Sequence, residues 1–277
     1  MLLRRARTPQ YKPTLARPNL ANPLLRDIRM LVLLNEKGGS PRCAITGAVG
    51  VREGSTAWGS SDKGAVLSFD GVDDDVLFSG AFSNISGSTG TFFMYAPVVR
   101  TQDSSGTVLW GSNTGATTWF QVDTVAADDT FAFGTQISGM GANFWSSTNT
   151  AIILAGNGST QFAYLGTDQA GWESNSAVSA GTAWGAGAKN IELGGFIGGG
   201  SWDFDGEMLV AGYSARVWSE DEAMSFWLDP MQVIAPQSRR ALASVAAPSG
   251  RIMSSLAGGG GLAGPGGIAG ISGGLAA

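Results

Sequence analysis

The stretch 201-SWDFDGEMLVAGYSARVWSEDEAMSFWLDP-230 joins a strand pattern to a helix pattern. Every second residue of 209–217 is apolar, and a period of two is that of a β-strand. Gly212, Ser214 and Arg216 occupy the other phase, which suits a less buried face. The apolar residues expected on one face are Leu209, Ala211, Tyr213, Ala215 and Val217.

A short helix is predicted directly after this strand. Ser219 and Glu222 have the S-x-x-E spacing of a capping box, which satisfies backbone N–H groups at the start of a helix. The acids between them favour the positive end of the helix dipole. Asp229-Pro230 ends the helix, because a residue before proline avoids the helical region. The residues spaced to face the sheet are Ala223, Phe226 and Trp227.

A second stretch, 65-AVLSFDGVDDDVLF-78, predicts strand, turn and strand. Asp70-Gly71 supplies the turn, since glycine accepts a positive φ and aspartate bonds to its own backbone. We expect the two flanking strands to form a hairpin.

Together, these stretches resemble the laminin-G-like, concanavalin A-like jelly-roll domains common in bacteriophage proteins. The shared pattern is A-L-x-F-D-G-x-D-D-x-V, then F-x-G before a hydrophobic strand, R-x-W-S-x-x-E and a closing D-P. The segment from Asn22-Pro23 to Glu36 resembles the usual start of those domains. The resemblance covers roughly residues 22–240. It implies an all-β, concanavalin A-like jelly-roll sandwich at 22–245 with one short C-terminal helix, a basic arm at 1–21 and a Gly/Ala-rich tail at 246–277.

The remaining pattern also indicates many short strands, as in a sandwich or jelly roll. We expect a loop at 58–64, a bulge or sheet edge at Pro97 and a hairpin turn at Asn157-Gly158. The predicted strands are 30–34, 44–51, 91–99, 107–111, 117–122, 130–133, 151–154, 161–165 and 191–193.

The composition narrows the chemistry. The 42 glycines and 14% charged residues favour a turn-rich β protein. The absence of histidine removes the commonest general base and metal ligand. Cys43 is the only cysteine, so no intrachain disulfide forms, which fits a reducing cytoplasm. With no signal peptide and no apolar run of membrane-spanning length, we expect a soluble protein with no membrane partner.

The two ends differ from the middle. The expected assembly arm carries Arg4, Arg5, Arg7, Lys12 and Arg17 before the first acid, Asp27. Either it is a solvated tail, or it lies on an acidic neighbour such as another copy. Nucleic-acid binding is the weaker reading, since Tyr11 is the arm's only aromatic residue. Residues 246–277 contain eleven glycines and no acid, so isolated apolar residues there would anchor the tail only on a partner.

Two groups of acids are candidates for chemical sites. Asp203, Asp205 and Glu207 alternate, and D-x-D-x-E loosely resembles the E-x-D-x-E catalytic strand of jelly-roll glycoside hydrolases. The first position departs from that pattern, so we expect no enzyme and no catalytic residue. The run Asp73, Asp74 and Asp75 offers weak calcium candidates, but a solvated acidic turn is commoner. We therefore expect no metal and no cofactor.

Tryptophans provide the candidate contact residues. Trp172 and Trp184 lie in segments predicted as loops, where an exposed indole would stack on a sugar ring or on a neighbouring subunit. The alternative is that each folds back onto the sandwich. The tryptophans expected in the core are Trp110, Trp119, Trp218 and Trp227.

The resemblance implies a bacteriophage virion structural protein, either a capsid decoration or a head or tail fibre component. Its expected partners are capsid or other virion proteins and further copies of itself, in a virion assembled in the host cytoplasm. The alternative is a glycan-binding module for attachment to a host or surface. A glycan hydrolase is the third hypothesis.

Overall fold

The computed structural model describes residues 16–36, 38–83, 85, 89–100, 106–113, 116–125, 128–133, 136–137, 144, 146–178, 189–195 and 203–235. For residues 106–137, 178 and 189 it describes the backbone alone. The chain divides into units 1–237 and 238–277, and every described residue belongs to the first.

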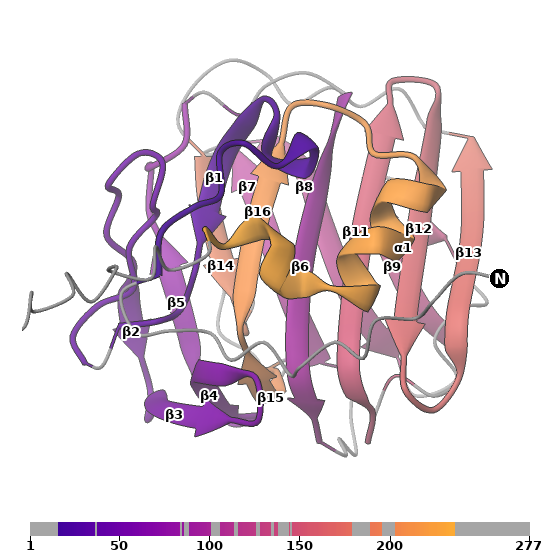
Figure 1. Ribbon diagram of the computed structural model, residues 1–277. Helices are drawn as coiled ribbons and strands as arrows, with labels where there is room; N and C mark the ends of the chain where they lie inside the picture. The colour runs from indigo at the N-terminus through magenta and orange to yellow at the C-terminus, as the bar shows by residue number, and fades with distance from the viewer. Residues whose placement is uncertain are drawn as a thin grey trace, which may run out of the picture. The chain divides into compact units, whose positions relative to one another are not determined.

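The described strands form two antiparallel sheets (Figure 1). The nine-stranded sheet runs β13 (Gly171–Val178), β12 (Thr160–Thr167), β11 (Thr148–Asn157), β6 (Thr89–Val99), β15 (Asp205–Met208), β4 (Gly64–Asp70) and β3 (Ala57–Ser61). In the same sheet β16 (Val210–Ser214) pairs with β6 and with β1 (Ile28–Val32). The seven-stranded sheet runs β10 (Gln136–Ile137), β9 (Asp128–Phe133), β8 (Ala116–Val125), β7 (Gly106–Asn113), β14 (Lys189–Leu193), β5 (Asp75–Phe78) and β2 (Val51–Glu53). The prediction of an all-β jelly-roll sandwich is confirmed.

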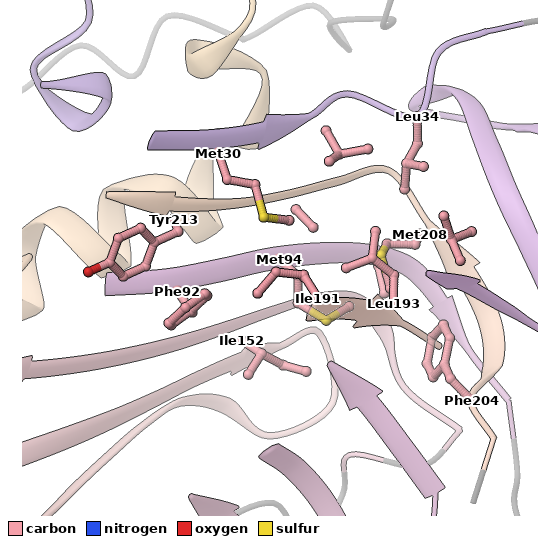
Figure 2. Close-up of a cluster of buried hydrophobic side chains, with 14 of the residues drawn as sticks. Met30, Leu34, Phe92, Met94, Ile152, Ile191, Leu193, Phe204, Met208 and Tyr213 are labelled. Atoms are coloured by element: carbon pink, nitrogen blue, oxygen red, sulfur yellow. The ribbon is translucent and has the colours of Figure 1, made fainter. Parts of the chain in front are cut away.

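The main core lies between the two sheets. Phe92 and Met94 of β6 point into it, toward Ile191 of the opposite sheet (Figure 2). All three side chains are buried. Burying a side chain of this size stabilises a fold by about 1.5–3 kcal/mol, so this layer is the main source of cohesion.

A second apolar layer covers the outer face of the nine-stranded sheet. It comes from α1 (Glu220–Leu228) and the 3-10 turns η1 (Pro23–Leu25) and η2 (Pro230–Val233) (Figure 1). The Phe93 ring of β6 stacks on the Trp218 ring, with centroids 4.6 Å apart. It also contacts the Phe226 ring of α1 edge to face, with centroids 5.1 Å apart. Because β6 is buried on both faces, its sequence is apolar without alternation.

Pro97 marks an irregularity inside the sheet and not an edge. On one side of β6 the neighbour changes from β16, paired at Tyr95, to β15, paired at Val98. On the other side Asn149, between the residues paired with Ala96 and Val98, has φ of 51°. Proline is tolerated here because the break between β15 and β16 removes the need for its missing N–H.

The strand–helix stretch is confirmed with two corrections. The capping box at Ser219 is present, and Ala211 and Tyr213 face the main core as predicted. However, the strand ends at Ser214, and Leu209 and Val217 pack in the outer layer instead. Gly212 and Ser214 are also buried, because the outer layer covers their face. A Cβ on Gly212 would lie 2.4 Å from the Phe93 ring.

The predicted hairpin within residues 65–78 is wrong. Gly71 has φ of 75°, so the turn is present, but β4 and β5 belong to different sheets and do not pair. The chain crosses from one layer to the other at Asp70-Gly71. A turn motif fixes a change of direction, whereas pairing depends on partners from elsewhere in the chain.

Three local predictions fail near weak strand signals. The predicted strand 44–51 contains a turn at 44–46 and reaches β2 only at Val51. The predicted loop 58–64 overlaps β3, whose small residues pair through their backbone with β4. The strand β13 lies where a loop was expected around Trp172.

The other predicted strands each overlap an observed one: 30–34, 91–99, 107–111, 117–122, 130–133, 151–154, 161–165 and 191–193. The Asn157-Gly158 turn between β11 and β12 is confirmed, with Gly158 at φ of 91°. Asn157 Oδ1 accepts hydrogen bonds from the N–H groups of Ser159 and Thr160, which fixes the turn.

The two ends of the described region are bonded to each other. Asn19 N–H donates to the Val233 carbonyl at 2.8 Å, and Ala235 N–H donates to the Arg17 carbonyl at 2.7 Å. Arg17 is exposed, whereas Arg4, Arg5, Arg7, Lys12 and the tail 246–277 are not among the described residues. Among the residues that are described, no helix has the length and apolarity needed to cross a membrane.

Candidate functional site

The edge of the nine-stranded sheet carries aromatic and hydroxyl side chains side by side. Antiparallel pairing places Phe162 opposite Ser176, Tyr164 opposite Ser174, and Gly166 opposite Trp172. Side chains of paired residues project to the same face of a sheet, so these six positions share the outer face of β12 and β13.

Four rings follow one another here, and we call Phe162, Tyr164, Trp172 and Trp227 the aromatic row. The ring centroids of Phe162 and Tyr164 are 6.4 Å apart with planes inclined by 1°. Tyr164 and Trp172 are 5.8 Å apart at 15°, and Trp172 and Trp227 are 5.8 Å apart at 29°. Near-parallel rings at such spacings attract one another beyond their buried area, which rigidifies the row.

Glycine at position 166 makes room for the last ring. A Cβ built on Gly166 would lie 2.4 Å from Cγ of Trp227, closer than atoms can approach. The indole of Trp227 therefore rests on the backbone of β12, and its Nε1–H donates to the Asn149 carbonyl at 3.0 Å. These contacts dock α1 against the row.

The start of α1 places a carboxylate at the same edge. Trp172 Nε1–H donates to Glu220 Oε1 at 3.0 Å. The helix start is fixed because Ser219 N–H donates to Glu222 Oε2, and Arg216 donates to the same oxygen at 2.6 Å. Although burial opposes it, the hydrogen bond from Arg216 lowers the pKa of Glu222, so the bridge stays charged at neutral pH.

Beside the row lies a shallow hollow of about 330 Å³, which we call the aromatic groove. Its lining residues are Phe162, Tyr164, Ser174, Asn175, Ser176 and Glu220. Burial raises the pKa of Tyr164, and the negative charge of Glu220 raises it further, so the phenol keeps its proton. The groove combines flat apolar walls with hydroxyl and carboxylate groups that bind polar ligands.

The predicted contact tryptophans have different outcomes. Trp172 lies in strand β13 and not in a loop, and it is half-buried against Tyr164 and Trp227. Trp172 therefore packs against the aromatic row beside the groove and is not an isolated indole in a loop. Trp184 falls in a part of the chain that the structure does not describe. Trp218 is buried as predicted, Trp227 is half-buried, and the side chains of Trp110 and Trp119 are also not described.

The alternating acids of β15 lie away from this groove. Arg100 forms ion pairs with Asp205 at 2.8 Å and with Glu207 at 3.6 Å. Within the sheet, β11 and β6 separate β15 from β12. Burial, and then the charges of Asp73, Asp70 and Asp74, raise the pKa of Asp203 to about 6. Of the three alternating acids, Asp205 and Glu207 therefore pair with Arg100, whereas Asp203 lies near a separate group of aspartates.

That second group contains the weak metal candidates. Asp73 and Asp74 meet Asp70 at the turn between β4 and β5, where one carboxylate oxygen of each lies within 4.8 Å of the others. Asp75 instead interacts with Glu192 of β14. Burial raises the pKa of Asp75 to about 6 and that of Glu192 to about 8, with neighbouring acids adding to both shifts.

The sequence did not identify the groove. The available signal was the alternation of Phe162 and Tyr164 in a predicted strand, followed by the polar run from Glu173 to Ser176. Because β13 was not predicted, nothing in the sequence indicated that this polar run lies beside the two rings. Nothing in it indicated either that Glu220 lies next to them.

The fold and groove define the protein as an all-β sandwich with an aromatic edge. No family model matches the chain, and no curated protein sequence matches it. Solved structures do resemble it. A mutant Trypanosoma rangeli sialidase displaying trans-sialidase activity has a TM-score of 0.55 and 9% identity, over 80% of this chain and 37% of that one. The same organism's sialidase in complex with sialic acid has a TM-score of 0.53 and 11% identity, over 75% and 33% of the two chains.

A third similar structure is the binding domain of botulinum neurotoxin serotype G, with a TM-score of 0.53 and 7% identity over 73% of this chain and 50% of that one. This chain therefore spans about a third of the sialidases and half of the neurotoxin domain. At these identities the likeness establishes the β-sandwich fold.

Proposed function

We propose that the protein is a glycan-binding module and that the aromatic groove is its binding site. The observation that carries this proposal is the pairing of β12 with β13, which sets Phe162 and Tyr164 beside Ser174 and Ser176. A sugar ring has apolar C–H faces and a polar rim of hydroxyl groups. The two walls of the groove offer one partner for each.

The dimensions and the rigidity of the groove agree with this role. Small-ligand sites begin at about 300 Å³, and this groove measures about 330 Å³. Because the aromatic row is stacked and its Trp227 end is bonded to Asn149, little side-chain entropy is lost when a ligand binds. The similar structures add that this fold occurs in a sialidase solved with sialic acid and in a toxin's receptor-binding domain.

The test begins with a glycan array and continues with titration calorimetry on the best glycan. Phe162→Ala removes one wall, and we expect affinity to fall at least about tenfold, since a buried aromatic contact contributes about 1.4 kcal/mol or more. Trp172→Ala should weaken binding as well, because it releases both Tyr164 and Glu220.

Trp58→Ala is the matched control, because Trp58 is also half-buried and donates through Nε1–H, in its case to the Gly39 carbonyl. It lies in β3, at the far end of the sheet order, and should leave affinity unchanged. Equal losses in Phe162→Ala and Trp58→Ala would place the binding site elsewhere. If no glycan binds, the groove is better explained as a protein contact, such as the virion assembly that the family resemblance implies.

A further inference from the structure

We infer that the aromatic groove selects glycans that carry no acidic group, namely neutral sugars and amino sugars, and that Glu220 sets this preference. This selectivity rests on the proposed glycan-binding function and adds to it the class of glycan. Among the described residues, the groove is lined by one carboxylate, that of Glu220, and by no basic side chain. A ligand that enters the groove therefore meets a negative charge and no positive one.

The carboxylate of Glu220 is held beside the aromatic row. Its Oε1 accepts a hydrogen bond from Trp172 Nε1–H at 3.0 Å. Its charge also acts on the groove wall, because after burial it is the second cause that raises the pKa of Tyr164. A sugar stacked on this wall would place its rim next to the carboxylate. Hydroxyl and ammonium groups can donate hydrogen bonds to it there, whereas a sugar carboxylate would meet an unfavourable like charge.

No basic side chain offsets the charge of Glu220 in the part of the chain that the structure describes. The ion pairs found there involve Lys63, Arg100 and Arg216, and none includes Glu220. Arg216, which lies just before α1, is paired with Glu222 at 2.6 Å. Arginine is the usual partner of a carboxylate ligand, because its guanidinium presents two parallel N–H donors. The groove therefore lacks the group that would hold the carboxylate of an acidic sugar.

The start of α1 does not reverse this preference, although the first turn of a helix attracts anions. Its Glu222 N–H already donates to the Ser219 hydroxyl at 3.3 Å. The first turn also carries three acids, Glu220, Asp221 and Glu222. A helix start is equivalent to about half an elementary positive charge, so the two acids that Arg216 does not pair outweigh it. The field at this end of the groove is therefore negative.

The experiment uses the full chain on an array that holds neutral, amino, sialylated and uronic-acid glycans. Calorimetry then compares the best neutral glycan with its analogue in which one C6 hydroxymethyl group is oxidised to a carboxylate. We expect the neutral glycan to bind at least about tenfold more tightly. Glu220→Gln should remove most of this difference. In the unmodified protein the difference should narrow between about 20 mM and about 500 mM salt, because Glu220 is exposed and its charge is screened.

Asp221→Asn is the matched control, because Asp221 is an exposed acid of the same helical turn but does not line the groove. It should keep the full difference between the two glycans. If both variants change that difference alike, net charge and not Glu220 sets the preference, and the inference is wrong. If acidic glycans bind best and Phe162→Ala abolishes their binding, the glycan-binding function stands but the selectivity is wrong. If no glycan binds at all, the function and the selectivity fail together.

Discussion

Glu192 is 2% exposed and lies among other acids. Burial is the largest cause of its altered ionisation, followed by the negative charges of Asp75, Glu53 and Asp203. Together they raise the pKa of Glu192 from 4.5 to about 8, so the folded protein holds a proton there at neutral pH. The unfolded chain would release that proton above about pH 4.5, which makes stability dependent on pH.

We predict that the free energy of unfolding falls as pH rises from about 4.5 to about 8 in the presence of EDTA. Below this window Glu192 is protonated in both states, and within it only the folded state keeps the proton, so unfolding becomes easier as pH increases. Asp75 and Asp203, with pKa values raised to about 6, add to the lower part of the window. Urea midpoints measured at pH 5, 6.5 and 8 would give the slope.

Glu192→Gln should remove the decline between about pH 6 and pH 8, because glutamine has no proton to release. Asp62→Asn should leave that decline unchanged, since Asp62 is largely exposed. A Glu192→Gln variant with an unaltered slope would show that another group controls the pH dependence.

Among the elements, the contact between α1 and β12 depends on a single missing side chain. The Trp227 ring occupies the space that a Cβ on Gly166 would need. Gly166→Ala should therefore destabilise the protein by about 1–3 kcal/mol, the usual cost of overpacking, and displace Trp227. Denaturant midpoints and the tryptophan emission maximum would measure both effects.

Gly59→Ala is the control for this prediction. Gly59 lies in β3, and a Cβ there would meet its nearest atom, Val66 Cγ2, at an ordinary 3.5 Å. Its midpoint should change little. Similar losses from both substitutions would attribute the effect to glycine's backbone and not to the helix contact.

Local signals in the sequence predicted elements well where one residue type decides the geometry. Ser219 and Glu222 predicted a helix start, and Asn157-Gly158 predicted a hairpin, because a cap and a tight turn depend on neighbours in sequence. Asp70-Gly71 predicted its turn but not its pairing, since the partners of β4 and β5 come from distant strands. The strands β3 and β13 are poor in branched apolar residues, so their pairing was not predicted.

The candidate sites were less predictable because they join distant segments. The acidic run that contains Asp73 and Asp74 is visible in the sequence, but the buried position of Asp74 depends on the surrounding fold. The aromatic groove joins β12, β13 and α1, which lie together only in the folded sheet. Residues 162 and 220 carry no motif that would connect them.

At the scale of the whole molecule, residues 17–19 belong to the folded sandwich. They bond to residues 233–235, and Asn19 and Asn22 also donate through Nδ2 to the Gln232 carbonyl. We predict that a protein lacking residues 1–15 and 246–277 melts within about 2 °C of the full chain. A protein lacking 1–21 and 246–277 should melt at a lower temperature than the first. Several buried or half-buried hydrogen bonds are lost in the second case.

Calorimetry on the two truncated proteins would check this prediction. A large loss in the first protein would show that residues 1–15 or 246–277 contribute to the stability of the fold. Equal stability of both proteins would show that the bonds of Arg17 and Asn19 contribute little, and the boundary of the folded domain would then lie beyond residue 21.

The stacked indoles of Trp172 and Trp227, whose centroids are 5.8 Å apart, have a spectroscopic consequence. Two chromophores at this separation couple their electronic transitions, so the pair should produce a circular dichroism signal that neither ring gives alone. That signal depends on the relative orientation of the two rings, whose planes are inclined by 29°. The circular dichroism of this tryptophan pair would thus report ligand binding in the neighbouring groove without an added label.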